Sequence, residues 1–253
     1  ALSGEDGNGK NVAVGHQALE TQNAGTDAYN VAVGQNAGKA ITTGPSNVLI
    51  GGLSGTALTT GAENIAIGYA ALSTEDTRGR NIAIGTLALS SQNSGADAYN
   101  IAIGHTAGTA MTTGVENTII GGLAGDALTT GGYNVAVGFR ALSTEDAHGY
   151  NVALGYQALN VQDAGANAAN VAVGFNAGGG ITTGINNITM GGYAGDGLTT
   201  GSYNIAIGHN ALSAEDAHGR NVAIGQEALR YQDAGADAYN VAIGFNTGGA
   251  ITT

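Results

Sequence analysis

Apolar residues alternate with small and polar residues in a five-residue pattern that occurs fourteen times along the chain. The first copy is Asn-Val-Ala-Val-Gly at 11–15, and the second and fourth positions are Val or Ile in nearly every copy. β-Branched residues at alternate positions favour a short strand with one buried face, and the flanking Asn and Gly leave too little length for a helix. The sequence therefore predicts fourteen short strands, whose pentapeptides start at Asn11, Asn30, Asn47, Asn64, Asn81, Asn100, Asn117, Asn134, Asn151, Asn170, Asn187, Asn204, Asn221 and Asn240.

The spacing of the pentapeptides is as regular as their composition. Successive copies are separated by 19, 17, 17 and 17 residues, and the series then starts again, which gives 70-residue units at 11–80, 81–150 and 151–220 and a partial one at 221–253. Such fixed periods are typical of solenoids, in which each coil stacks on the previous one. We predict an all-β parallel β-solenoid of about fourteen coils, a single repeat domain over 1–253. Because neither end carries a polar cap, we expect a fragment of a longer chain.

The residues after each pentapeptide follow two designs. One is Gly-x-x-Ala-Leu, as at 68–72, and the other is Gly-x-x-Ala-Gly, as at 34–38. Both are followed by stretches rich in Gly, Asn, Ser and Thr, which are typical of turns. Each coil is therefore expected to hold two short strands joined by turns.

The third pentapeptide position is nearly constant, being Ala in eleven copies and Leu49, Ile119 or Thr189 in the others. Alternation places this side chain on the strand face opposite to the Val and Ile residues. A face in contact with solvent would carry more varied, polar residues, so we interpret this face as one packed against another copy of the chain. The seam residues would be Ala13, Ala32, Ala66, Ala83, Ala102, Ala136, Ala153, Ala172, Ala206, Ala223 and Ala242.

The first pentapeptide position is Asn in all fourteen copies. Asn tolerates left-handed backbone conformations and can hydrogen bond to the neighbouring backbone, and identical amides on stacked coils can form a ladder. We therefore predict a structural rather than a ligand-binding role for this column.

The composition of the chain disfavours several classes of function. The net charge of −12 disfavours binding to nucleic acid or to an anionic membrane, and no apolar run approaches the ~20 residues needed to span a bilayer. There is no cysteine, so disulfides play no part. No nucleophile elbow, zinc-protease helix or carboxylate pair on a cleft can be recognised. We therefore expect neither catalysis nor a cofactor.

Each 19-residue coil contains an extra loop, and three of the four loops contain a Tyr. Exposed aromatic rings can stack on sugars, so Tyr29, Tyr99 and Tyr239 are candidate contacts to a host-surface glycan or receptor. The alternative is that each Tyr packs over the edge of its coil or against a neighbouring chain, and Ala169 interrupts the series. The loops lie at 22–30, 92–100, 162–170 and 232–240.

Acidic pairs recur at 5–6, 75–76, 145–146 and 215–216. They could collect Ca²⁺, which takes several oxygen ligands. However, Arg78, His148 and His218 lie two residues after three of the pairs, and local ion pairing is the simpler explanation. We therefore predict no metal site.

Two further motifs have limited value. Gly-Gly-x-x-Gly at 51–55, 121–125 and 191–195 lacks the Lys-Ser/Thr of a phosphate-binding loop, and we interpret these segments as turns. A Thr column suggests an ice-binding ladder as a minor alternative, but Ser91, Val161, Ala214 and Tyr231 interrupt it. Its members are Thr21, Thr43, Thr60 and Thr74.

The repeats resemble those of phage tail-fibre proteins and, less closely, the head repeats of YadA-type trimeric autotransporter adhesins. The resemblance covers essentially the whole chain, and coils of 17 and 19 residues favour the fibre type because the adhesin coil is shorter. It is carried by Asn-x-Ala-x-Gly-x-x-Ala-Leu at 64–72, 134–142 and 204–212 and by Thr-Thr-Gly at 59–61, 129–131 and 199–201.

This resemblance implies a left-handed β-roll in each chain and three chains around one axis. It implies a rigid shaft in a tail fibre, located on a virion, that presents a host-receptor-binding region. The alternative that it leaves open is the head of an adhesin on a bacterial cell surface. In both cases the main partner is a further copy of the same chain.

Overall fold

The computed structural model of the chain describes residues 1–4, 9–214, 217–233 and 235–252. The fold divides into two compact units, Ala1–Gly131 and Gly132–Thr253. Both are built in the same way from short strands and turns, and the described residues contain no helix. Each unit is an all-β parallel β-solenoid, as the repeat pattern predicts.

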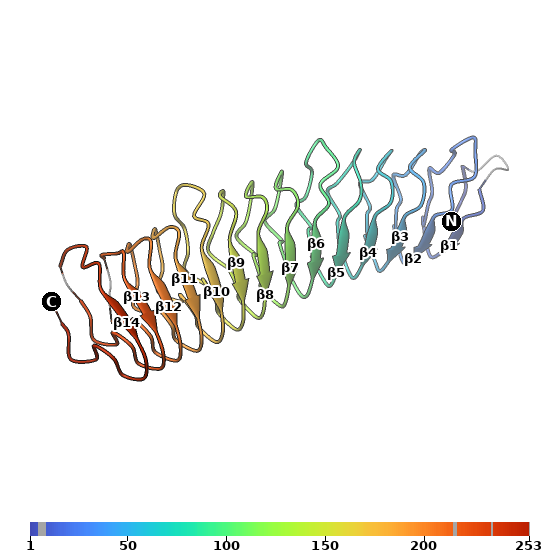
Figure 1. Cartoon of the computed structure of the whole chain (residues 1–253). Helices are drawn as coiled ribbons and strands as arrows, with labels where there is room; N and C mark the ends of the chain where they lie inside the picture. Colours follow the sequence, from blue (N-terminus) through green and yellow to red (C-terminus); the bar gives the residue numbers. More distant parts are fainter. Residues whose placement is uncertain (5–8, 215–216, 234, 253) are drawn as a thin grey trace. The chain divides into compact units, whose positions relative to one another are not determined.

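In each unit, seven three-residue strands pair in chain order to form a parallel sheet (Figure 1). The strands of the first unit are β1 (Val12–Val14), β2 (Val31–Val33), β3 (Val48–Ile50), β4 (Ile65–Ile67), β5 (Ile82–Ile84), β6 (Ile101–Ile103) and β7 (Thr118–Ile120). Those of the second unit are β8 (Val135–Val137), β9 (Val152–Leu154), β10 (Val171–Val173), β11 (Ile188–Met190), β12 (Ile205–Ile207), β13 (Val222–Ile224) and β14 (Val241–Ile243).

Every strand consists of the three central residues of a pentapeptide, which confirms the prediction of one strand at each of these positions. The register is also regular, because equivalent residues pair: Ala66 with Ala83, for example, and Ile67 with Ile84. Residues at the same position in successive repeats, which form a column in the aligned sequence, therefore lie in a row along each unit.

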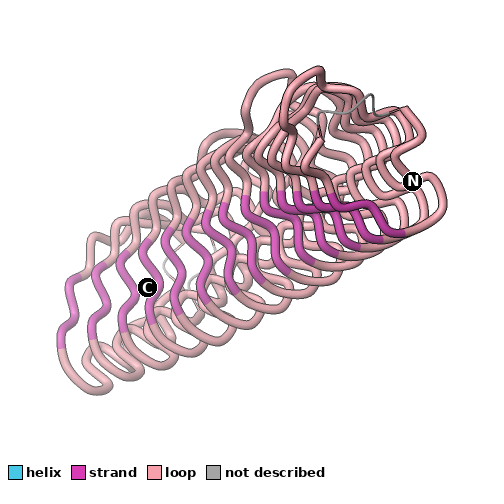
Figure 2. The backbone as a smooth tube through the Cα atoms, turned by 90° about the vertical axis from the view of Figure 1, so that its right-hand side faces the viewer, coloured by secondary structure: helices cyan, strands magenta, loops and turns pink. Residues whose placement is uncertain are grey.

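The prediction of a second strand in each coil is wrong. The strands lie on one face of each unit, and turns form the other sides (Figure 2). Each 17-residue coil has four positions with a positive φ, which in the β4 coil are Glu63, Gly68, Ala70 and Leu72, and each 19-residue coil has a fifth in its extra loop. Repeated positive φ bends the chain too sharply for a second strand, and most of these positions carry residues other than Gly, which adds backbone strain.

The pentapeptide Gly is required by the close stacking of the coils. At Gly85 φ is +136°, a conformation that side chains disfavour, and a Cβ atom there would lie 2.2 Å from the carbonyl oxygen of Gly104 in the next coil. Gly34, Gly68 and Gly138 show the same close approach to the following coil. Any larger residue would push two coils apart.

The pentapeptide alanines point into the core of their own chain, so the predicted seam is wrong for these residues. Ala13 is half-buried in the first strand, and the other ten have exposed fractions of 0–4% within the single chain. No side chain buried in this way can contact another chain. The corrected residues are Ala13, Ala32, Ala66, Ala83, Ala102, Ala136, Ala153, Ala172, Ala206, Ala223 and Ala242.

The narrow core explains why this position is small. Where the third position is Leu49, the facing turns carry Gly38 and Gly55, and a Cβ atom on either glycine would lie 2.6–2.7 Å from a δ-carbon of Leu49. The large side chain of Leu49 therefore fits into the core because the facing turn residues are glycines, which have no side chain. The constant Ala reflects the width of the coil interior, which is packed to the density of a protein core.

The Asn column forms the predicted hydrogen-bond ladder. Within each unit, the backbone N–H of every pentapeptide Asn after the first donates to the side-chain Oδ1 of the Asn in the preceding coil, at 3.0 Å from Asn64 to Asn47 and again from Asn81 to Asn64. The expected left-handed conformation lies one position earlier, at residues such as Glu63 and Arg80. The ladder satisfies buried polar groups between coils, so its structural role is confirmed.

Replacing Asn64 by Ala tests the ladder. The substitution removes two bonds donated by Nδ2, to Asn47 Oδ1 and to the carbonyl of Arg78, and one accepted from the N–H of Asn81. Asn81→Ala is the matched control, because within the described part of the chain Asn81 Nδ2 has no hydrogen-bond partner and Asn81 Oδ1 accepts one bond from Asn100. Asn64→Ala should lower the unfolding free energy by about 1–3 kcal/mol more than Asn81→Ala in urea titrations. Both variants lose one ladder bond to Oδ1, so equal losses would contradict a contribution from the two Nδ2 bonds of Asn64.

Replacing Gly85 by Ala tests the stacking constraint. The clash with Gly104 and the positive φ should together cost roughly 2–6 kcal/mol. Gly95 in the same coil is the control, because its φ is +67° but a Cβ atom there meets nothing within 4 Å. Gly95→Ala should therefore cost only about 1–2 kcal/mol. Thermal unfolding curves that rank the two variants in the opposite order would rule out close stacking at this glycine.

Candidate functional site

The second and fourth residues of each pentapeptide, which are the first and third residues of each strand, point away from the core and form an apolar outer face on each unit. Val12 and Val14 are 50% and 57% exposed, Ile188 and Met190 are 37% and 39% exposed, and most others are half-buried by their neighbours in the same row. Parallel sheets are normally covered on both faces. An open face of Val and Ile is therefore typical of an interaction surface.

The three candidate tyrosines do not lie at the tips of the extra loops. Tyr29, Tyr99 and Tyr239 each have a positive φ and directly precede a pentapeptide Asn, in the same row as Glu63 and Arg80. Their rings are 51–64% exposed. The loops themselves are present as predicted, but each returns to the regular row before its Tyr.

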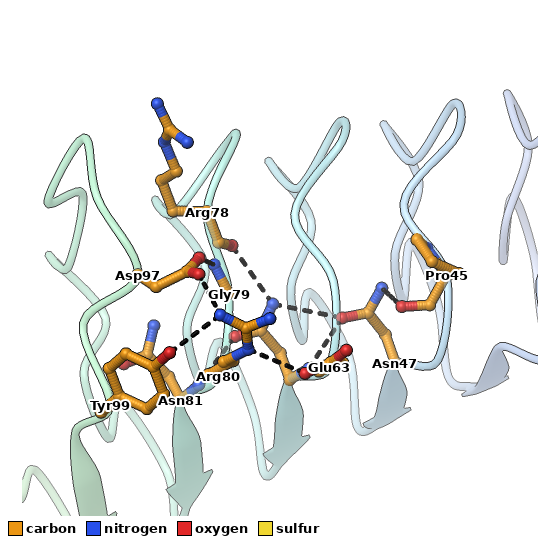
Figure 3. Close-up of polar contacts among 10 residues, drawn as sticks. Pro45, Asn47, Glu63, Arg78, Gly79, Arg80, Asn81, Asp97 and Tyr99 are labelled. Atoms are coloured by element: carbon orange, nitrogen blue, oxygen red, sulfur yellow. Dashed lines mark hydrogen bonds and ion pairs between the residues drawn. The ribbon is translucent and has the colours of Figure 1, made fainter.

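Each of these rings contacts a basic residue of the preceding coil. Arg80 is 5.5 Å from the centre of the Tyr99 ring and donates a hydrogen bond of 2.8 Å to Tyr99 Oη (Figure 3). It also pairs with Glu63 at 2.9 Å and with Asp97. The bond to Glu63 raises the pKa of Arg80, which stays charged. The guanidinium group thus connects three successive coils.

The same arrangement recurs wherever the Tyr is present. Lys10 contacts Tyr29 and pairs with Asp27, and Arg220 contacts Tyr239 and pairs with Asp237. In the remaining super-repeat the three positions change together, to Tyr150, Asn167 and Ala169. The Tyr therefore belongs to a cation–π and ion-pair contact between coils, which supports the alternative that it packs over the coil edge. The glycan contact stays a prediction.

A shallow hollow lies beside Arg80. Its volume of about 190 Å³ is below the 300–1,000 Å³ that is usual for small-molecule sites. It is lined by Thr60, Ala62, Glu63, Thr77, Arg78, Gly79, Arg80 and Asp97. A hollow of this size and polarity can hold water or the end of a side chain, but it does not enclose a ligand.

The second unit has a row of exposed aromatic rings that sequence reasoning missed. Phe139, Tyr156 and Phe175 follow a pentapeptide Gly directly, and their ring centres are 5.7 and 5.1 Å apart with nearly parallel planes. Tyr193 and His209 extend the row edge-on at 5.2 and 6.1 Å. Stacked rings cover one another's faces, and sugars need a free face, so this row stabilises the stacking of coils.

The acidic pairs are split between core and surface. Glu75 is fully buried in the same column as Leu58 and Gln92, whereas Asp76 lies nearer the surface. Glu75 Oε1 accepts a bond of 3.3 Å from the N–H of Arg78, and Oε2 has no hydrogen-bond partner in the described part of the chain. Burial raises the pKa of Glu75. Residues 5, 6, 215 and 216 lie outside the described residues.

The remaining motifs are structural. The three Gly-Gly-x-x-Gly segments form turns, as predicted. The threonines expected in one column do not form one row, because Thr60 donates to the carbonyl of Thr77 in the next coil and does not align with Thr74. Thr21 donates to the carbonyl of Lys39 at 2.8 Å and Thr74 to that of Ser90 at 2.6 Å, so these hydroxyl groups also join coils.

Comparisons with known proteins do not assign the chain to a family. No protein-family profile matches the chain, and no curated protein or solved structure matches it either. Among the described residues, no helix has the length and apolar character needed to cross a bilayer. The functional interpretation therefore rests on the repeats and on the surfaces described above.

Replacing Glu75 by Gln tests the buried acid. Because folding raises this pKa, the ionised carboxylate destabilises the fold at neutral pH, and the effect disappears as pH falls through the raised pKa towards the ordinary value of 4.5. Glu75→Gln should therefore raise the melting temperature at pH 7, and the gain should shrink at acidic pH. Glu63→Gln, which alters an exposed ion pair, should change little. A less stable Glu75→Gln protein at pH 7 would contradict the assignment.

Proposed function

We propose that the chain is a structural segment of a homotrimeric fibre, in which three left-handed β-rolls pack around one axis. The observation that supports this proposal is the outer face of Val and Ile, which a single chain leaves open on each unit. Three chains that turn these faces towards one another would cover both sides of every sheet. In this proposal the interface between chains is formed by the Val and Ile residues on either side of each pentapeptide Ala, and not by the alanines.

The segment acts mechanically in this proposal. Successive coils are joined by backbone hydrogen bonds on several sides, such as Val31 N to Asn47 O at 2.8 Å, Leu19 N to Ala37 O at 3.1 Å and Thr42 N to Thr59 O at 2.9 Å. A body held together in this way resists bending. The resemblance to tail-fibre repeats then gives it a place on a virion, where a stiff shaft holds a receptor-binding region away from the particle.

The outer face gives a direct test. Ile205 and Val222 are paired neighbours on this face, in β12 and β13. The wild-type chain should have three times the mass of one 24.7 kDa chain in light scattering, and Ile205→Gln/Val222→Gln should shift it towards the monomer. These side chains point outward, so circular dichroism should still report the same fold.

The control is Tyr231→Gln, which changes an exposed side chain outside the strands and should leave the trimer intact. A stable wild-type monomer, or a double variant that keeps the wild-type mass, would overturn the proposed assembly.

A further inference from the structure

Four side chains with metal-binding atoms converge in the second unit. Glu145, Asp146 and His148 come from the turn after β8, and Asp163 comes from the extra loop after β9. Taking one ligand atom from each residue, all four atoms lie within 4.8 Å of one another. Ligands around one ion of typical size are separated by such distances, since metal–ligand bonds are about 2.0–2.2 Å long for nitrogen and oxygen.

The buried member of this cluster has an unsatisfied atom. The exposed fraction of Glu145 is 0%, and its Oε1 accepts a bond of 3.1 Å from the backbone N–H of His148. Its Oε2 is buried and has no hydrogen-bond partner among the residues that the structure describes. The Nδ1 atom of His148 is buried and lies 3.4 Å from Glu145 Oε1, which places the imidazole beside the carboxylate. A buried acceptor without a partner is rare and costly, and a bound cation would satisfy it.

The equivalent site in the first unit differs in net charge, although Glu75 Oε2 also has no hydrogen-bond partner among the described residues. Seventy residues earlier, Glu75 and Asp76 are retained, but Arg78 replaces His148 and Asn93 replaces Asp163. With ionised side chains that site carries a net charge of −1, whereas the second site carries −3 with a neutral imidazole. A divalent cation would bring the second site to the charge of the first. Both differences make the second site more negative, since His148 stands in place of a cation and Asp163 adds an anion.

The third super-repeat has the same four residue types. His218 and Asp233 occupy the positions of His148 and Asp163, and the sequence places Glu215 and Asp216 before them. Residues 215 and 216 lie outside the described residues, so the argument rests on the site at 145–163. The paired change from Arg and Asn to His and Asp therefore occurs twice in one chain.

We propose that Glu145, Asp146, His148 and Asp163 bind a divalent transition-metal ion, with zinc as the best fit. Zinc accepts mixed nitrogen and oxygen ligands in four-coordinate sites. Calcium and magnesium prefer oxygen alone, so the imidazole favours zinc over both. The ion would join two successive coils at the base of the extra loop. This role is independent of trimer formation.

The site is tested on the full chain, first stripped with a chelator and then titrated with Zn²⁺ alone. The protein should bind Zn²⁺ and gain melting temperature, and Co²⁺ in its place should give the absorption bands of a tetrahedral ion with nitrogen and oxygen ligands. Ca²⁺ at the same concentration should give no comparable gain. A chain that binds no Zn²⁺, or that is stabilised only by Ca²⁺, would overturn the proposal.

The decisive variant is His148→Arg/Asp163→Asn, which converts the site into its counterpart in the first unit and should therefore fold. After dialysis it should retain one Zn²⁺ fewer per chain than the wild type, and its thermal stability without metal should be equal or higher. His105→Arg, a substitution outside the cluster, should keep the wild-type stoichiometry. If the double variant and the wild type bind equal amounts of Zn²⁺, the ion is bound elsewhere and the assignment fails.

Discussion

The structure of each unit depends on how closely one coil can stack on the next. The spacing is set where the pentapeptide glycines meet, because the carbonyl of Gly104 occupies the space that a side chain on Gly85 would need. The Asn ladder then uses this spacing, since each side-chain Oδ1 reaches the backbone N–H of the next coil at about 3 Å. Hydrogen bonding and steric contact thus define the same repeat distance, and both need an identical residue in every coil.

Close stacking has a consequence for the core. A coil of 17 residues with four positive-φ positions encloses a narrow interior, which is filled by small strand residues and by Leu or Ile from the turns. The larger Val and Ile side chains of the strand must then lie outside. A single chain therefore cannot bury its most apolar columns, and this is the physical basis of the proposed assembly of several chains.

Much of the fold could be predicted from the sequence, because identical residues must stack in register. The fourteen strands, their parallel order within each unit, the Asn ladder and the extra loops were all predictable in this way. Which face of each strand is buried could not be predicted, because alternation defines two faces but does not indicate which one lies in the core. Ala66 and Ile67 show the difficulty: hydrophobicity alone would place Ile67 in the core, but volume places Ala66 there. The single strand per coil was missed because residues such as Ala70 and Leu72 rarely adopt positive φ.

The candidate sites were harder to predict because their residues are distant in the sequence but adjacent between coils. Tyr99 contacts Arg80, nineteen residues earlier, and Asp163 lies beside His148, fifteen residues earlier. In both cases the contact residues change together between super-repeats, since Lys10, Arg80 and Arg220 accompany a Tyr whereas Tyr150 accompanies Ala169. Coupled changes are expected when neighbours share one charge balance, and here they can be seen by comparing the chain with itself. In a solenoid, internal repeats therefore provide the comparison that identifies a site, provided that positions are paired across coils rather than along the sequence.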